Sequence, residues 1–339
     1  MRNRNDLPAR SRRSMAEAGT SAATPMEIDG DIALPVAPPQ QQPPPPHIFL
    51  YDTDLKSTLE ARAVRLHSWE KKELAKVARD NYRIVQQGQY IDEFSNMHSV
   101  DLAADAVNSS HRAPQGGGRP LGVRHARTRL AVVRMDTATC TRAMHDLREP
   151  AAALNFANQN HPGGGYLNGA RAQEEDLCRL MPPLYSSLMA HRYPLKDDQA
   201  LYTRTWICRT AGNYHLVGPP VPAHVITAAM PDLHSYARRK LKPRSEQWRQ
   251  TVTVRVRAVL HAARMEGCSA LVLGAFGCGA FGNPPQDVAA VFARCLASAE
   301  FRGAFATVVF AIAEFRASDE GNLAAFADAM AGLCRDAGG

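Results

Sequence analysis

Residues 152–175 read AALNFANQNHPGGGYLNGARAQEE, and this stretch decides the predicted fold. It begins with a short apolar run, residues 152–156, which has the length and composition of a buried strand. A polar loop with three consecutive glycines follows, and from Gln173 the pattern becomes helical. Because strands that lead through loops into helices are typical of sheets covered by helices, we expect an α/β fold.

The same alternation of apolar runs and helical patterns continues on both sides of this stretch. Strands are predicted at Leu130–Met135, Ala152–Phe156, His224–Ala229, Leu271–Phe276 and Thr307–Ile312. Helices are predicted at 66–91, 137–147, 173–190, 248–266, 285–299 and 321–334, with a loop at 108–126. This order favours a sheet that is at least partly parallel, with helices on both faces and ligands at the carboxyl ends of its strands.

The composition changes near residue 47. Residues 1–46 contain nine of the 23 prolines and no regular apolar pattern, which predicts a disordered, Pro-rich tail. This tail carries dispersed arginines, at positions 2, 4, 10, 12 and 13. Such arginines are compatible with a nuclear-import or nucleic-acid patch, but they are more often only solvated.

Composition also excludes several classes of protein. No run of 18 apolar residues occurs and the first residues are polar, so we expect neither a membrane span nor a secretory signal. The seven cysteines lie far apart, which argues against a disulfide framework and favours an intracellular protein, cytoplasmic or nuclear. The formal net charge of +7 is compatible with a polyanionic partner or with no more than a soluble surface.

The first glycine-rich loop is the strongest candidate for a binding site. Gly163, Gly164 and Gly165 provide a backbone without side chains that can lie against a ligand and point N–H groups at it. A flexible linker is the alternative, although a linker is seldom followed at once by a helix. Glu174 and Glu175 begin that helix, where acids also serve simply to compensate the helix dipole.

The spacing of these residues resembles that of a known family. Gly163 to Gly165, a spacer of seven residues and Gln173-Glu174-Glu175, preceded by Phe156-Ala157-Asn158, resemble the signature of poly(ADP-ribose) glycohydrolases of the compact bacterial and fungal type. The resemblance covers about residues 65–315. It implies a three-layer α/β/α, macrodomain-like fold with a mixed central sheet. The expected domains are the tail at 1–46, a helical extension at 47–125 and a catalytic core at 126–339.

The second glycine-rich loop follows a predicted strand, and its binding residues are expected to be Gly277, Cys278, Gly279, Ala280, Phe281 and Gly282. These residues spell GxGxxG, but only residues 283–339 follow, too few for the rest of a dinucleotide-binding domain. We expect the loop to hold a diphosphate at the start of a helix that is capped by Asn283. In the related macrodomains Phe281 matches a residue that packs on the distal ribose, whereas Phe276 is better explained as core.

Adjacent glutamates restrict the mechanism. Glu174 and Glu175 lie about 100° apart around a helix and cannot face each other across a sugar, so one must do most of the proton transfer. The resemblance assigns Glu175 as general acid/base and Glu174 to the ribose hydroxyls. It places Asn158 and the glycines Gly163, Gly164 and Gly165 around the terminal ribose, with Gln173 also in the binding site.

Other residues carry weaker signals. The histidines show no metal-binding spacing, and neither a metal nor another cofactor is expected. His161 is compatible with a ribose contact or a turn, and Cys278 has no base beside it that would make it a nucleophile. A basic cluster, compatible with a second phosphate-rich unit or with a solvated loop, is formed by Arg238, Arg239, Lys240, Lys242 and Arg244.

The sequence therefore predicts an enzyme that hydrolyses poly(ADP-ribose) to ADP-ribose. Its expected partners are the polymer, ADP-ribose and ADP-ribosylated proteins, without membrane contact or direct binding of nucleic acid. Two alternatives remain open, an ADP-ribose-binding module without catalysis and a hydrolase of single ADP-ribose groups on protein or nucleic acid.

Overall fold

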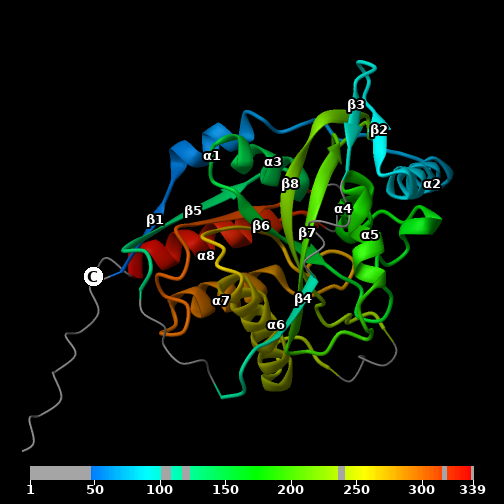
Figure 1. The fold of residues 1–339 in the computed structure, drawn as a ribbon. Helices are drawn as coiled ribbons and strands as arrows, with labels where there is room; N and C mark the ends of the chain where they lie inside the picture. The colour runs from blue at the N-terminus through cyan, green and yellow to red at the C-terminus, as the bar shows by residue number, and fades with distance from the viewer. Residues whose placement is uncertain (1–46, 101–107, 117–122, 236–240, 315–318, 337–339) are drawn as a thin grey trace, which may run out of the picture. The chain divides into compact units, whose positions relative to one another are not determined.

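The structure is a computed structural model that describes residues 47–100, 108–116, 123–235, 241–314 and 319–336. Pro44–Gly339 form one compact unit. At its centre is an eight-stranded sheet with the order β1-β5-β10-β9-β6-β8-β7-β4 (Figure 1). No helix in these described ranges is long and apolar enough to cross a membrane. The predicted tail at 1–46 lies outside the described residues, and the predicted boundary at residue 125 stays a prediction.

The strands of the central sheet are β1 (Ile48–Tyr51), β4 (Asn108–Arg112), β5 (Arg127–Val133), β6 (Ala151–Phe156), β7 (Gln199–Arg209), β8 (Leu216–Ala228), β9 (Ala270–Leu273) and β10 (Thr307–Ala311). From β1 to β8 in the sheet order, neighbouring strands pair in parallel, while β7 and β4 complete one edge in antiparallel pairing. A separate hairpin is formed by β2 (Gln89–Ile91) and β3 (Met97–Ser99). The sheet is therefore mixed, as predicted.

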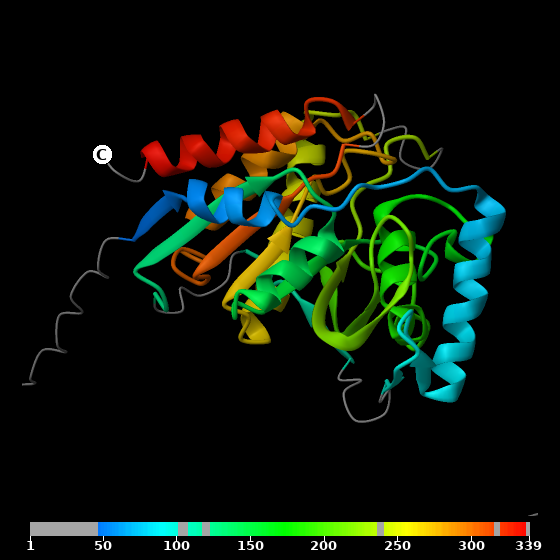
Figure 2. The same ribbon diagram turned by 90° about the horizontal axis from the view of Figure 1, so that it is seen from above.

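Helices cover both faces of the sheet. One face carries α6 (Glu246–Met265), α7 (Pro285–Ala297) and α8 (Asn322–Asp336). The other face carries α1 (Thr53–Glu60), α3 (Thr137–Asp146), α4 (Gln173–Leu180) and α5 (Pro182–Met189). The longer α2 (Lys71–Gln87) packs on α4 and α5 at the outer edge of the fold (Figure 2). This confirms the three-layer α/β/α architecture with an N-terminal helical extension.

Alternating side chains of the buried strands supply the two cores. In β5, Leu130 and Val132 belong to the core beneath α6, α7 and α8, while Ala131 and Val133 belong to the core beneath α1 and α3. Successive strand residues point to opposite faces, so an uninterrupted apolar run is what a strand buried on both faces requires. Because β5, β10, β9 and β6 pair in parallel, their carboxyl ends lie together at one end of the strands.

The structure corrects three of the predicted elements. The helix predicted at 173–190 is two helices, because Pro182 begins α5 and Met181 before it, with φ −122° and ψ 81°, is not helical. The loop predicted at 108–126 contains β4, whose polar residues pair with β7 at the sheet edge. The helix predicted at 66–91 spans only Lys71–Gln87: Glu70 and Glu73 form a capping box at its start, and Gly88, in the left-handed conformation, ends it before β2.

Candidate active site

The loops that follow β5, β6, β9 and β10 surround a cleft of about 630 Å³ at the carboxyl ends of these strands. That volume is within the usual range for a site that encloses a small organic ligand. Most of the predicted site residues line it, namely Asn158, Gln173, Glu174, Glu175, Gly277, Gly279, Ala280 and Phe281. The other predicted residues, Gly163, Gly164, Gly165, Cys278 and Gly282, belong to the same two loops but do not line the cleft.

The glycine-rich loop after β6 wraps around the two glutamates that begin α4. Gly163 N donates to Glu174 Oε1 at 3.1 Å, and Gly165 N donates to Glu175 Oε1 at 2.8 Å. Gly164 N donates to the carbonyl of His161. The expectation that these N–H groups point at a ligand is therefore wrong, because two carboxylates brought together at one helix N-terminus take the donors themselves.

The shape of this loop explains why glycine is needed. Gly163 and Gly164 have φ values of 70° and 53°, in the left-handed region that side chains disfavour. A Cβ atom on Gly164 would lie 2.5 Å from Glu175 Oε1 and 3.2 Å from Glu174 Oε2. On Gly163 it would lie 2.6 Å from the ring of Tyr185. The loop can approach the carboxylates closely only where it has no side chains.

Glu174 is the more deeply buried of the two acids, with 2% of its surface exposed against 7% for Glu175. Its Oε2 accepts a hydrogen bond of 2.8 Å from Asn158 N. Burial raises the pKa of Glu174 to about 8, and the negative charge of Glu175 adds to this, while the N–H groups of Asn158 and Gly163 oppose it only in part. The site therefore favours the protonated form of Glu174 over the charged form.

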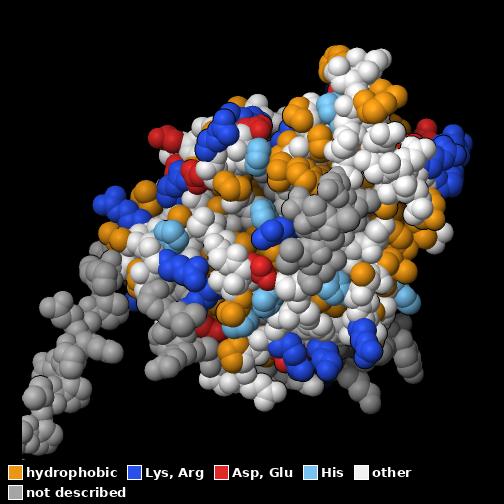
Figure 3. Space-filling view, viewed as in Figure 1, with side chains coloured by type: hydrophobic (Ala, Val, Ile, Leu, Met, Phe, Trp, Pro, Cys, Tyr) orange, Lys and Arg blue, Asp and Glu red, His pale blue; other side chains and the backbone are white. Residues whose placement is uncertain are grey.

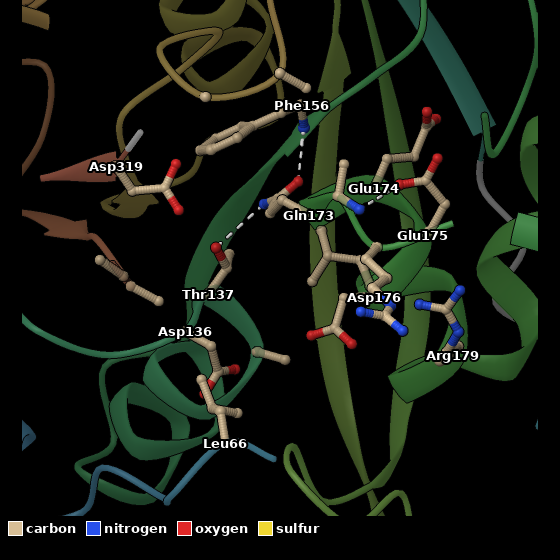
Figure 4. A pocket seen from close by; sticks show the side chains of 18 of the residues that line it. Leu66, Asp136, Thr137, Phe156, Gln173, Glu174, Glu175, Asp176, Arg179 and Asp319 are labelled. Atoms are coloured by element: carbon tan, nitrogen blue, oxygen red, sulfur yellow. Dashed lines mark hydrogen bonds between the residues drawn. The ribbon is translucent and has the colours of Figure 1, made fainter. Parts of the chain in front are cut away.

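Glu175 is held by the start of its own helix as well as by the loop. Ala172 N donates to its Oε2 at 2.9 Å, which is the contact that a glutamate makes at the third helical position when it caps a helix. With Gly165 N on the other oxygen, both ends of the carboxylate are fixed. The glutamate is thus both a capping residue and a rigidly positioned group at the cleft (Figure 4).

Gln173 fastens α4 to the sheet. Its Nε2 donates to Leu154 O at 2.7 Å and to Thr137 Oγ1 at 3.1 Å, and its Oε1 accepts from Phe156 N at 2.8 Å (Figure 4). Both amide hydrogens are used within the protein, so the side chain acts by positioning the two glutamates that follow it. Asn158 stabilises the turn after β6 in a similar way, since its Oδ1 accepts from the N–H groups of Asn160 and His161.

The second glycine-rich loop leaves N–H groups free. Cys278 N and Gly282 N donate to carbonyl oxygens of their own turn. Within the described part of the chain, four other N–H groups of this loop have no acceptor, those of Gly277, Gly279, Ala280 and Phe281. All four of these residues line the cleft. Neighbouring N–H groups without an acceptor form an anion-binding concavity, which fits the predicted diphosphate site.

Buried groups hold this second loop in place. The sequence suggested that Asn283 caps the helix. In the structure Pro284 occupies the capping position of α7, and no side chain caps it. Instead, the buried carboxamide of Asn283 accepts from Trp248 Nε1 at 2.9 Å and donates to Pro231 O and Gly277 O. These partners use the oxygen and both hydrogens of the amide. The side chain of Asn283 therefore holds the second loop against Trp248 and Pro231 and does not cap a helix.

The aromatic residues and the cysteine of the second loop have distinct places. Phe276 is fully buried, with its ring centroid 5.5 Å from that of Phe156, as expected for core. Phe281 is partly exposed and lines the cleft. Cys278 is buried, and burial raises the pKa of its thiol well above the usual range, which disfavours a nucleophile. In the predicted basic cluster, Arg238, Arg239 and Lys240 lie outside the described residues; Lys242 and Arg244 are exposed, and Arg244 pairs with Asp287 at 2.7 Å.

Three further acids line the cleft that sequence reasoning missed, Asp136, Asp176 and Asp319. Asp136 caps α3 through Oδ1, while its buried Oδ2 has no partner among the described residues, and burial raises its pKa. Burial also raises the pKa of Asp176 to about 6, against the effect of the hydroxyl that Tyr214 donates to it. Figure 4 shows Asp136 and Asp176 below Gln173. An aspartate directly after a buried strand was the available signal for Asp136.

A segment from the N-terminal region closes one side of the cleft. Leu66, His67, Ser68 and Trp69 line it between α1 and α2. Trp69 Nε1 donates to Gly212 O at 2.7 Å, and its ring packs edge-on against Tyr214 with centroids 5.5 Å apart. Nothing in the local sequence indicates these contacts, because their partners are more than a hundred residues away. No group of three or more His, Cys, Asp or Glu side chains in the described ranges is placed to bind a metal.

The fold and cleft define a macrodomain-like protein in which paired carboxylates and a loop with unpaired N–H groups line one cleft. Comparisons with known proteins agree. Residues 78–208 match the family model described as microbial-type PARG, catalytic domain. A crystal structure of poly(ADP-ribose) glycohydrolase from Thermomonospora curvata is 30% identical, with a TM-score of 0.66 over 76% of this chain and 99% of that one. The same protein with the inhibitor ADP-HPD matches with a TM-score of 0.65 and the same identity and coverage.

A second relative is the poly(ADP-ribose) glycohydrolase from Deinococcus radiodurans in complex with ADP-ribose. It is 32% identical, with a TM-score of 0.56 over 69% of this chain and 98% of that one. No protein among those with curated descriptions matches the chain. The chain therefore belongs to the poly(ADP-ribose) glycohydrolase family, in its microbial type.

Proposed function

We propose that this protein hydrolyses the ribose–ribose O-glycosidic bonds of poly(ADP-ribose) and releases ADP-ribose. The observation that carries the proposal is that the two glycine-rich loops use their N–H groups differently. One loop uses its N–H groups to hold Glu174 and Glu175, and the other leaves the N–H groups of cleft residues without acceptors. An acidic end for a sugar and an N–H-rich end for a diphosphate are together what ADP-ribose requires.

Glu175 transfers the proton in this proposal. Glu175 is the more exposed of the two adjacent carboxyls, and both of its oxygens are held in place at the cleft. As general acid, Glu175 gives a proton to the leaving ribose oxygen as the bond to the anomeric carbon breaks. Water then adds to that carbon and returns a proton to Glu175, so that one water is consumed for each bond. Glu174 and Asn158 bind the terminal ribose.

The adenine is proposed to bind beside Asp136. Its Oδ2 is a buried acceptor without a partner, and an unpartnered buried acceptor is costly unless a ligand supplies a donor. The exocyclic amine of adenine is such a donor. The diphosphate then lies at the loop of Gly277 to Phe281, and Phe281 packs on the distal ribose. ADP-ribosylated proteins are the partners that would present the polymer.

Release of ADP-ribose from labelled polymer tests the proposed function. We expect the wild type to shorten the polymer and to release ADP-ribose as the product. A protein that binds ADP-ribose but releases none would be a binding module. A protein that removes single groups from mono-ADP-ribosylated protein or nucleic acid but leaves the polymer intact would be the other alternative. Either result overturns the proposal.

A further inference from the structure

A stripe of basic side chains runs along the outer face of α2. Its members are Lys72, Lys76, Arg79 and Arg83, and all four are exposed. At 100° per residue they fall within an arc of about 60°, and at 1.5 Å per residue they span about 17 Å. Figure 3, viewed as in Figure 1, shows Lys and Arg side chains gathered over α2. We call these four residues the α2 stripe.

Acidic neighbours do little to neutralise the α2 stripe. Lys72 forms an exposed ion pair of 2.9 Å with Glu70, whereas the other three have no ion-pair partner within the described ranges. The two acids within α2 are engaged elsewhere: Glu73 closes the capping box, and Asp80 pairs with Arg209. Four cations therefore share one helix face with a single competing carboxylate.

The N-terminal end of α2 lies beside the cleft. Trp69, which precedes α2, and Leu74, near its start, line the cleft. Leu74 lies about 200° around the helix from Lys72, so the α2 stripe is on the outer face, away from the cleft. The backbone of Lys71 lies against Gly169, so close that a Cβ atom there would be 2.0 Å from Lys71 O. Gly169 belongs to the segment that joins the glycine-rich loop to Glu175, so a chain that leaves the acid end of the cleft can reach the outer face of α2 around its N-terminal end.

From this geometry we infer that the α2 stripe binds the units of poly(ADP-ribose) that lie outside the cleft. The inference rests on the proposed function, because it needs a polymer whose end is in the cleft. Each unit of that polymer carries a diphosphate, and a row of cations at helical spacing suits a flexible polyanion without fixing its sequence. The exposed ring of Tyr82, next to Arg79 on the helix, offers a surface on which an adenine can stack. The α2 stripe thus favours long polymer over short.

The test compares a long polymer with a dimer of ADP-ribose as substrates. The variant Lys76→Gln, Arg79→Gln, Arg83→Gln removes three charges and keeps residues that favour a helix. We expect kcat/KM for long polymer to fall about tenfold at low salt, as for the loss of three exposed ionic contacts, while kcat/KM for the dimer stays unchanged. The slope of log(kcat/KM) against log[salt] for long polymer should become shallower by about 2.

A matched control removes three arginines at the opposite end of the sheet, in or after the last turns of α7 and α8. It is Arg294→Gln, Arg302→Gln, Arg335→Gln, all exposed positions. This control should leave both substrates and the salt slope unchanged. Equal loss in the two triple variants would mean that only net charge matters, and it would overturn the inference.

Two further outcomes separate the inference from its alternatives. If the wild type releases ADP-ribose from both substrates and the α2 variant treats them as the wild type does, the inference is wrong and the proposed function stands. If the wild type releases none, the proposed function fails. Binding of single-stranded nucleic acid provides the last comparison. An α2 variant that loses this binding yet cleaves long polymer normally would assign the stripe to nucleic acid instead and overturn the inference.

Discussion

Replacing Gly164 by alanine should inactivate the enzyme with a modest loss of stability. Gly164 has a φ of 53°, and its added Cβ would lie 2.5 Å from Glu175 Oε1. The backbone conformation alone costs an alanine about 1–2 kcal/mol. To reach 3.4 Å, the beginning of ordinary contact, the carboxylate must move by 3.4 − 2.5 = 0.9 Å. A displacement of about 1 Å of a reacting group lowers turnover by about 100-fold.

Gly267 provides the matched control for this variant. It has a φ of 74°, also in the left-handed region, but a Cβ atom on it would have nothing within 4 Å. Gly267→Ala should therefore carry the same backbone cost with full activity. Urea unfolding and release of ADP-ribose, measured on both variants, separate strain from displacement of Glu175. Wild-type turnover in Gly164→Ala would refute the assigned contact between the loop and the acid.

Two more predictions concern buried groups. Glu174 has its pKa raised by burial from 4.5 to about 8, so the folded state binds the extra proton and the free energy of unfolding should fall as pH rises through this range. Glu174→Gln should lack that decline; an identical pH dependence of urea unfolding in variant and wild type would contradict it. Asn283→Ala leaves Trp248 Nε1, Pro231 O and Gly277 O without their partner and should cost about 3 kcal/mol. It should also weaken ADP-ribose binding in calorimetry, and a variant as stable as the wild type would disprove this role.

The sequence predicted β5, β6, β9 and β10 well, but it missed β7, which is mostly buried, and both edge strands, β1 and β4. β5, β6, β9 and β10 are covered on both faces, and their continuous apolar runs are visible in the sequence. β4, with the residues NSSHR, lies at the edge and has no such run, so its pairing with β7 could be known only from the structure. An apolar run in a sequence indicates a buried strand, and a polar edge strand such as β4 has no such run.

In the candidate site, too, some residues could be predicted from the sequence and others could not. Gln173, Glu174 and Glu175 could be found because local spacing carries their motif. Asp176 and Tyr214 meet only because α4 and the turn between β7 and β8 come together in space. The sequence also could not tell which loop keeps its N–H groups, since that depends on the carboxylates that face each loop. Gln173 was expected to bind the ligand, but its amide donates to Leu154 O and Thr137 Oγ1, so it is a positioning residue.

The most direct test of the central claim compares Glu175→Gln with Glu174→Gln and the wild type. Release of ADP-ribose from polymer and calorimetric binding of ADP-ribose are measured on all three proteins. We predict that Glu175→Gln binds ADP-ribose with nearly wild-type affinity and releases none from polymer, because the change removes the proton donor and keeps the shape. Glu174→Gln should lose affinity and keep residual turnover. Wild-type turnover in Glu175→Gln would contradict the assignment of Glu175 as the acid.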